Sequence, residues 1–171
     1  RDISSQIVLA RNDKTTPLKI AQQAISASGI KQAAHLTFVL QQEVGAECSF
    51  YTDQRAAVHI VELLLDNAIK FTRPSEAYQS KDTEEKEQVT MTVSSGSNTV
   101  RFTVDDTGIG VPPEEAERIF NEFVQLDEYY NGTGVGLTVA RSLARRLGGD
   151  AKLDTSCTTH TRFIVTLARK Q

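Results

Sequence analysis

Residues 89–110 read VTMTVSSGSNTVRFTVDDTGIG, and no other stretch says as much about the fold. Apolar and polar residues alternate on both sides of Ser95-Gly96-Ser97-Asn98, which is typical of two antiparallel strands joined by a hairpin turn. Because successive side chains of a strand point to opposite faces, such a pair buries one face and exposes the other. The stretch therefore predicts an antiparallel sheet that is covered on one side.

Helices expected to cover this sheet lie on either side of the hairpin. Pro17 suits a first helical turn and Gly29 a helix end, and Asp53 suits an N-cap before an apolar stripe that ends at Phe71. Another helix ends at Gly148-Gly149. The expected helices are 17–29, 53–71, a short acidic-headed one at 112–123, and 136–147.

Further alternating runs predict strands at 35–41, 48–51, 151–155 and 162–167, with a weaker one over 3–9. The strand at 48–51 is expected to return along the one before it. The polar run 73–88 predicts a solvated loop. Hairpin connections indicate an α+β fold, an α/β sandwich: a mostly antiparallel mixed sheet of about five strands with about three helices packed on one face.

The composition indicates one globular domain and excludes several classes of protein. The 171 residues carry a formal charge of −3, which argues against binding nucleic acid by electrostatics. No apolar run suits a bilayer span, and no signal-peptide pattern opens the chain. The two cysteines, Cys48 and Cys157, lack the spacing of a disulfide framework or a zinc site. Because the chain starts at Arg1 and its only methionine is Met91, we expect a piece of a longer protein.

Three segments break local rules in ways that suit ligand binding. In the first, Asn67 stands among apolar residues of the helix expected at 53–71, although asparagine is unfavourable in a helix interior. Lys70 follows within one turn, and a neutral oxygen ligand beside an ammonium suits a metal ion held together with a phosphate. In the alternative interpretation, Asn67 faces solvent and Asp66 forms an ordinary ion pair with Lys70.

The second and third segments are rich in glycine. Asp106 follows a strand, where a carboxylate can accept a hydrogen bond from an exocyclic amine, and Gly108 and Gly110 let a ligand approach; a plain Asp/Gly turn is the alternative. Residues 132–137, GTGVGL, enter a helix whose first N–H groups suit an anion. Their spacing is neither the dinucleotide fingerprint nor a P-loop.

In this order, the three segments resemble the N, G1 and G2 boxes of the sensor histidine kinase ATP-binding domain, in the superfamily shared with gyrase, Hsp90 and MutL. Between the last two, residues 118–123 (RIFNEF) resemble the F box. The likeness covers about residues 53–167. The segments NAIKFT (67–72) and LGG (147–149) are more similar to sensor kinases than to gyrase or Hsp90. Residues 125–131 resemble the short lid of bacterial hybrid two-component sensors.

This resemblance implies a role for each matched residue, with ATP and Mg²⁺ as cofactors. Asn67 would ligate Mg²⁺ and Lys70 would pair with the phosphates, so these two are the expected catalytic residues. Asp106 would accept the adenine amino hydrogen, with Gly108 and Gly110 making room for the ring. The expected triphosphate-binding segment comprises Gly132, Thr133, Gly134, Val135, Gly136 and Leu137.

Aromatic residues near the lid have two interpretations each. Phe120 and Phe123 either hold the base of the lid beside the nucleotide or pack in the core at i,i+3 spacing. Tyr129 and Tyr130 would touch either nucleotide or a neighbouring helical domain.

One position departs from the family pattern. Four residues before the Mg²⁺ asparagine, sensor kinases usually have Asn and gyrase-like ATPases have the water-activating Glu, whereas this chain has Leu63. Glu62 lies about 100° round the helix and cannot simply replace it. The departure disfavours a hydrolytic ATPase more than a kinase, whose nucleophile is a histidine from another domain.

The three histidines, His35, His59 and His160, all lack the context of a phosphoacceptor, and His160 is expected to affect only a turn. The resemblance therefore implies the cytoplasmic ATP-binding half of a kinase whose parent protein either does or does not span the inner membrane. Its partners would be a dimerisation and phosphoacceptor helical hairpin, absent from this chain, and a downstream response-regulator receiver domain, with no nucleic acid or direct membrane contact. We expect one domain over 1–171, with its core at 53–167 and a linker remnant at 1–16. A gyrase- or Hsp90-like ATPase module and a non-catalytic nucleotide-binding interaction domain are the alternatives.

Overall fold

The computed structural model describes residues 8–45, 47–73, 86–121 and 135–169. The hairpin expected at 89–106 is confirmed as the antiparallel pair β4 (Glu87–Ser95) and β5 (Thr99–Asp106), in which Val93 lies opposite Phe102. These two strands form the middle of the larger sheet of the described residues, whose strand order is β2-β4-β5-β7-β6. The β2–β4 pair is parallel and the other three pairs are antiparallel. The remaining strands of this sheet are β2 (Leu36–Gln42), β6 (Asp150–Leu153) and β7 (Thr161–Ala168).

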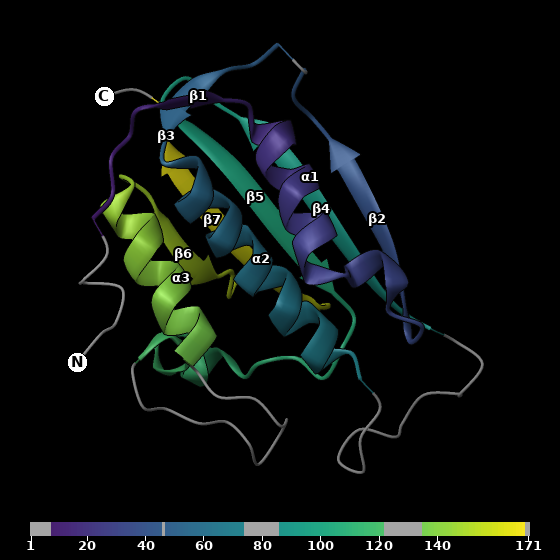
Figure 1. Cartoon of the computed structure of the whole chain (residues 1–171). Coiled ribbons are helices and arrows are strands. Elements are labelled where there is room, and N and C mark those ends of the chain that lie inside the picture. Colours follow the sequence, from purple (N-terminus) through teal and green to yellow (C-terminus); the bar gives the residue numbers. More distant parts are fainter. Residues whose placement is uncertain (1–7, 46, 74–85, 122–134, 170–171) are drawn as a thin grey trace.

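Three α-helices of the described part lie side by side over one face of this sheet, with α2 between α1 and α3 (Figure 1). They are α1 (Pro17–Ser28), α2 (Gln54–Phe71) and α3 (Val135–Arg146). The ends expected from sequence are confirmed: Gly29 adopts a left-handed φ of 71° after α1, and the Asp53 side chain accepts a hydrogen bond from the Ala56 N–H at 3.0 Å. The α+β class is confirmed.

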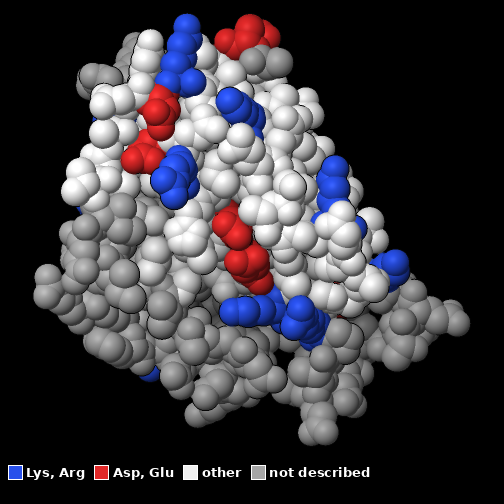
Figure 2. All heavy atoms as spheres, viewed as in Figure 1, with Lys and Arg blue, Asp and Glu red and all other residues white. Residues whose placement is uncertain are grey.

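The core lies between the helices and the sheet, and strand alternation decides which side chains reach it. Val89, Met91 and Val93 on β4 and the alternate residues of β5 are buried, whereas the intervening residues are polar and more exposed. Asp106 therefore faces the helices and is buried, while Asp105 faces the opposite side of the sheet. On the helical side, Figure 2 shows acidic and basic side chains interspersed among uncharged residues over the described surface.

Two strand predictions differ from the structure. Most of the strand expected over 3–9 lies outside the described residues, and its described residues, 8 and 9, are not in a strand; β1 forms at Asp13–Thr15, inside the expected linker 1–16. The segment expected to return along β2 is β3 (Phe50–Thr52), which pairs with β1 in a separate two-stranded sheet. Alternation of apolar residues predicts a strand, but it does not say which distant strand will be its partner.

Two further expectations need correction. The helix expected at 112–123 consists, in its described part, of two 3₁₀ turns, Pro113–Glu115 and Arg118–Phe120. Two adjacent prolines remove N–H donors there, and the turns close by i→i+3 hydrogen bonds. The loop expected at 73–88 ends earlier than predicted, because Glu87 begins β4 and is buried, where it accepts a hydrogen bond from the Thr107 hydroxyl at 2.7 Å.

Several expectations lie outside the described residues: the lid at 125–131, Phe123, Tyr129, Tyr130 and most of the loop at 73–88. None of the described helices has the length and apolar character needed to cross a membrane.

Candidate functional site

Asn67 lies on the last turns of α2 and is 7% exposed, so the interpretation in which it faces solvent is wrong. Its carboxamide nitrogen is buried and has no hydrogen-bond partner among the described residues. An unpaired buried polar atom costs about 1–3 kcal/mol, so its presence calls for a reason. Lys70, three positions later, is exposed. Burial raises the pKa of Asp66, and the charge of Lys70 only partly opposes this shift.

Asp106 ends β5 and is 1% exposed. One carboxyl oxygen, Oδ1, accepts a hydrogen bond from the Gly108 N–H at 2.9 Å, while Oδ2 is buried without a partner in the described part of the chain. Burial raises the pKa of Asp106 to about 7, and the Gly108 N–H opposes that shift. A second orphaned polar atom therefore lies at the end of β5.

The loop after Asp106 is held against the end of α2. The Ile109 N–H donates to the Phe71 carbonyl at 3.2 Å, and a Cβ on Gly108 would overlap with that same carbonyl oxygen. Gly110 has a φ of 81°, which favours glycine, and lies close to the buried Thr161 that is paired with Asp106 across β5 and β7. These contacts hold the end of α2, the helix that carries Asn67, against the loop that follows Asp106.

The start of α3 lies against α2 near Leu63. A Cβ on Gly136 would be 3.6 Å from Leu63 Cδ2, so the half-buried leucine packs where the family usually has a polar residue. Leu137 is buried in the core. Of the expected triphosphate-binding segment, Gly132, Thr133, Gly134 and the side chain of Val135 lie outside the described residues.

Phe120 packs in the core, as one of its two interpretations predicts. It is 4% exposed and meets the Phe163 ring edge-on at 6.1 Å. The sequence interpretation missed Arg141, whose guanidinium lies 4.1 Å from the centre of the Phe120 ring and donates to both carboxyl oxygens of Glu117. These hydrogen bonds hold the pKa of Glu117 below its usual value, and they tie the 3₁₀ segment to α3.

A cavity of about 330 Å³ lies between the loop 108–111 and the turn 153–161. Gly108 and Gly110, the residues expected to make room for the adenine ring, line it, whereas Asn67 and Asp106 do not. His160, expected to affect only a turn, lines this cavity, and its Nε2 lies 2.6 Å from Asp105 Oδ1. His160 therefore does more than shape a turn, because it also lines the cavity and contacts Asp105.

Asp106 is expected to make the stability of the nucleotide-free, metal-free chain depend on pH. Its folded pKa of about 7 lies above the value near 3.9 of an unfolded aspartate, so the folded chain keeps a proton that the unfolded chain loses. This stabilising contribution is complete below about pH 4 and is lost as the pH rises to about 7, at about 1.4 kcal/mol per pH unit.

Urea denaturation in EDTA, from about pH 5 to about pH 8, checks this prediction. The quantity to follow is the difference in the free energy of unfolding between the native chain and Asp106→Asn, because the contributions of other titrating groups cancel in that difference. We expect the difference to change up to about pH 7 and then to level off. A difference that stays constant throughout contradicts the raised pKa.

The catalytic domain of histidine kinase ThkA has a similar fold, with a TM-score of 0.74 at 18% identity, covering 96% of this chain and 100% of that domain. The fold is thus that of a histidine kinase catalytic domain. Residues 52–171 match the family described as Histidine kinase-, DNA gyrase B-, and HSP90-like ATPase, and the chain belongs to that family. The resemblance stated from the sequence is confirmed.

Curated relatives point to sensor kinases. Autoinducer 2 sensor kinase/phosphatase LuxQ of Vibrio vulnificus (strain YJ016) is 28% identical over 136 residues, covering 77% of this chain and 15% of LuxQ. Aerobic respiration control sensor protein ArcB of Escherichia coli (strain K12) is 32% identical over 125 residues, covering 70% of this chain and 14% of ArcB. The chain thus matches about a seventh of the length of these relatives.

Proposed function

We propose that this chain is the ATP-binding catalytic domain of a two-component sensor histidine kinase. In this proposal it holds ATP and Mg²⁺ and presents the γ-phosphate to a histidine on a dimerisation and phosphoacceptor domain outside this chain. A response-regulator receiver domain would then accept the phosphoryl group. The family supports ATP as the ligand, and the sensor kinases among the relatives support phosphotransfer.

The single observation that carries the proposal is the pair of orphaned buried polar atoms, Asn67 Nδ2 and Asp106 Oδ2. Each belongs to a different box of the family, and the contact of the Gly108 loop with Phe71 holds their elements together. The adenine amine of a bound nucleotide would donate to Asp106 Oδ2. The metal would be the partner at the orphaned position of Asn67 once the carboxamide turns its oxygen there, and both interactions would offset the cost of burial.

Each residue contributes a separate part of binding. Asp106 Oδ2 would accept a hydrogen bond from the adenine amine, while Oδ1 keeps its bond to the Gly108 N–H. Asn67 can turn its carboxamide oxygen toward a metal ion, and Lys70 would neutralise phosphate charge. Gly136 lies at the start of α3, where backbone N–H groups favour an anion. Mg²⁺, when bound, would neutralise charge on the transferring phosphate.

The surroundings of Glu62 support a kinase rather than a hydrolytic ATPase. Glu62 Oε1 lies 3.7 Å from His59 Nδ1, and both residues line a groove that does not contain Asn67 or Asp106. Leu63, at the position of the usual polar residue, packs near Gly136. A general base must be within hydrogen-bond reach of the attacking water, and Glu62 lines a groove with His59 that neither Asn67 nor Asp106 lines.

Calorimetric titration with ADP, in Mg²⁺ and in EDTA, tests the proposal. We expect binding by the native chain, and we expect Asn67→Ala to lower affinity at least about tenfold in Mg²⁺ with little change in EDTA. Because Asn67 carries an orphaned atom, this variant should remain folded. The exposed Asn12→Ala is the matched control and should bind as the native chain does. No binding of ADP by the native chain would refute the proposal.

A further inference from the structure

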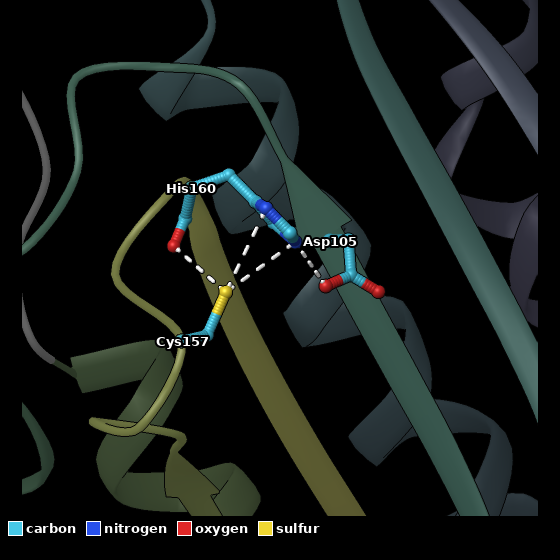
Figure 3. A group of neighbouring side chains, drawn as sticks. All are labelled: Asp105, Cys157 and His160. Carbon is cyan, nitrogen blue, oxygen red and sulfur yellow. Dashed lines mark hydrogen bonds and ion pairs between the residues drawn. The ribbon is translucent and has the colours of Figure 1, made fainter.

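Three potential metal ligands converge on the side of the sheet away from Asp106. Figure 3 shows Asp105 at the end of β5, Cys157 on the loop before β7 and His160 next to the first residue of β7, with their side chains pointing toward one another. One ligand atom from each lies within 4.8 Å of the others, and all three residues are half-buried. Carboxylate, thiolate and imidazole together suit a borderline-soft divalent cation.

The spacing of the ligand atoms is close to that of a tetrahedral zinc site. Bond lengths of about 2.3 Å to sulfur and about 2.0 Å to nitrogen place these two atoms about 3.6 Å apart. Cys157 Sγ lies 3.6 Å from His160 Nε2, and it is equally far from Nδ1. His160 Nε2 and Asp105 Oδ1 are 2.6 Å apart and share a proton, and they would have to separate by about 0.8 Å for a metal to take that proton's place.

Neighbouring groups already orient two of these ligands. His160 Nδ1 lies 2.9 Å from Thr159 Oγ1, while Nε2 is the nitrogen directed at Asp105. Arg162 Nε donates to Asp105 Oδ1 at 2.6 Å. Hydrogen bonds of this kind, to the second nitrogen of a histidine and to a ligating carboxylate, hold metal ligands in place in zinc proteins.

The charges of the cluster also favour a divalent ion. Asp105, Asp154 and a thiolate at Cys157 would carry three negative charges, and Arg162, which lies 3.5 Å from Asp154 and 2.6 Å from Asp105, carries one positive charge. A divalent cation would neutralise the two negative charges that remain. Cys157 and His160 both line the cavity of about 330 Å³, which gives room for entry and for a fourth ligand such as water.

From these contacts we propose that Asp105, Cys157 and His160 form a Zn²⁺ site. Its occupation releases the thiol proton of Cys157 to the buffer, and His160 binds through Nε2 as the neutral imidazole, with its proton on Nδ1 beside Thr159 Oγ1. The bound ion would join the loop before β7 to the end of β5. Asp105 and Asp106 lie on opposite faces of β5, so the proposed zinc ligands are different residues from the proposed nucleotide contacts. Cys157 and His160 share their cavity with Gly108 and Gly110, and the zinc proposal does not rest on nucleotide binding.

Titration of the full 171-residue chain with Co²⁺ tests the site, without nucleotide, in excess Mg²⁺ and with a phosphine reductant. We expect one Co²⁺ per chain, a sulfur-to-cobalt charge-transfer band and the strong visible bands of four-coordinate cobalt, all displaced by Zn²⁺. Cys157→Ser and His160→Gln should each weaken binding at least about 100-fold, and Thr159→Val about tenfold. Cys48→Ser is the matched control, since Cys48 donates to Ser95 instead, and it should bind as the native chain does.

Alkylation provides a second measurement on the native chain alone. Zn²⁺ should slow the alkylation of Cys157 at least about tenfold and leave Cys48 unchanged, as followed by mass spectrometry of each peptide. Circular dichroism of each variant verifies its fold. Weak octahedral cobalt bands without a charge-transfer band, equal affinity in Cys157→Ser, or equal protection of both cysteines would each overturn the proposal.

Discussion

Replacing Gly149 by alanine is expected to lower the free energy of unfolding by at least about 3 kcal/mol. The added Cβ would overlap with the carbonyl oxygen of Thr166 and lie 2.9 Å from the Cα of Leu167, so backbone must move. The position is constrained from the other side too, because the Gly149 N–H donates to the Ala144 carbonyl at 2.9 Å as α3 ends. Neither α3 nor β7 can give way without losing buried contacts.

Gly96→Ala is the matched control for this prediction. Gly96 lies in the β4–β5 turn, where an added Cβ meets nothing within 4 Å, so we expect a change within about 0.5 kcal/mol. Urea denaturation followed by circular dichroism measures both variants against the native chain. The steric interpretation fails if Gly149→Ala is no less stable than Gly96→Ala.

Asp106→Asn is expected to weaken ADP binding about 100-fold at pH values near 8, where the native carboxylate is ionised. The native side chain has two acceptors, and one of them, Oδ1, is used by the Gly108 N–H. An asparagine has a single acceptor oxygen. If that oxygen keeps the bond to Gly108, the amide NH₂ takes the place of Oδ2 and would face the amine of adenine, donor against donor.

The base of the nucleotide offers a sharper readout than affinity alone. Hypoxanthine has an acceptor oxygen where adenine has its amine, so the new NH₂ of Asp106→Asn should favour IDP. We expect native chain to prefer ADP and the variant to narrow or reverse that preference, measured by calorimetry of both nucleotides with both proteins. An equal loss for ADP and IDP would show that the variant damages the site without changing recognition of the base.

Local signals in the sequence were sufficient for much of the fold. The hairpin of β4 and β5, the cap at Asp53 and the end of α1 at Gly29 depend on residues within a few positions of one another, and all three predictions are confirmed. The 3₁₀ turns after Pro112 were missed because a short apolar spacing suits either helix type. Roles assigned to the site residues stay predictions, which the ADP titrations address.

The sequence alone predicted the α/β sandwich and the family, because strand alternation, helix caps and ordered motifs each depend on short stretches of residues. Tertiary structure decided the rest. It paired β3 with β1, and it left atoms of Asn67 and Asp106 buried without partners among the residues that the structure describes. It also brought Asp105 to Cys157 and His160 across more than fifty positions of sequence. These outcomes depend on which distant surfaces pack together and on what they exclude from water, and no local pattern encodes that.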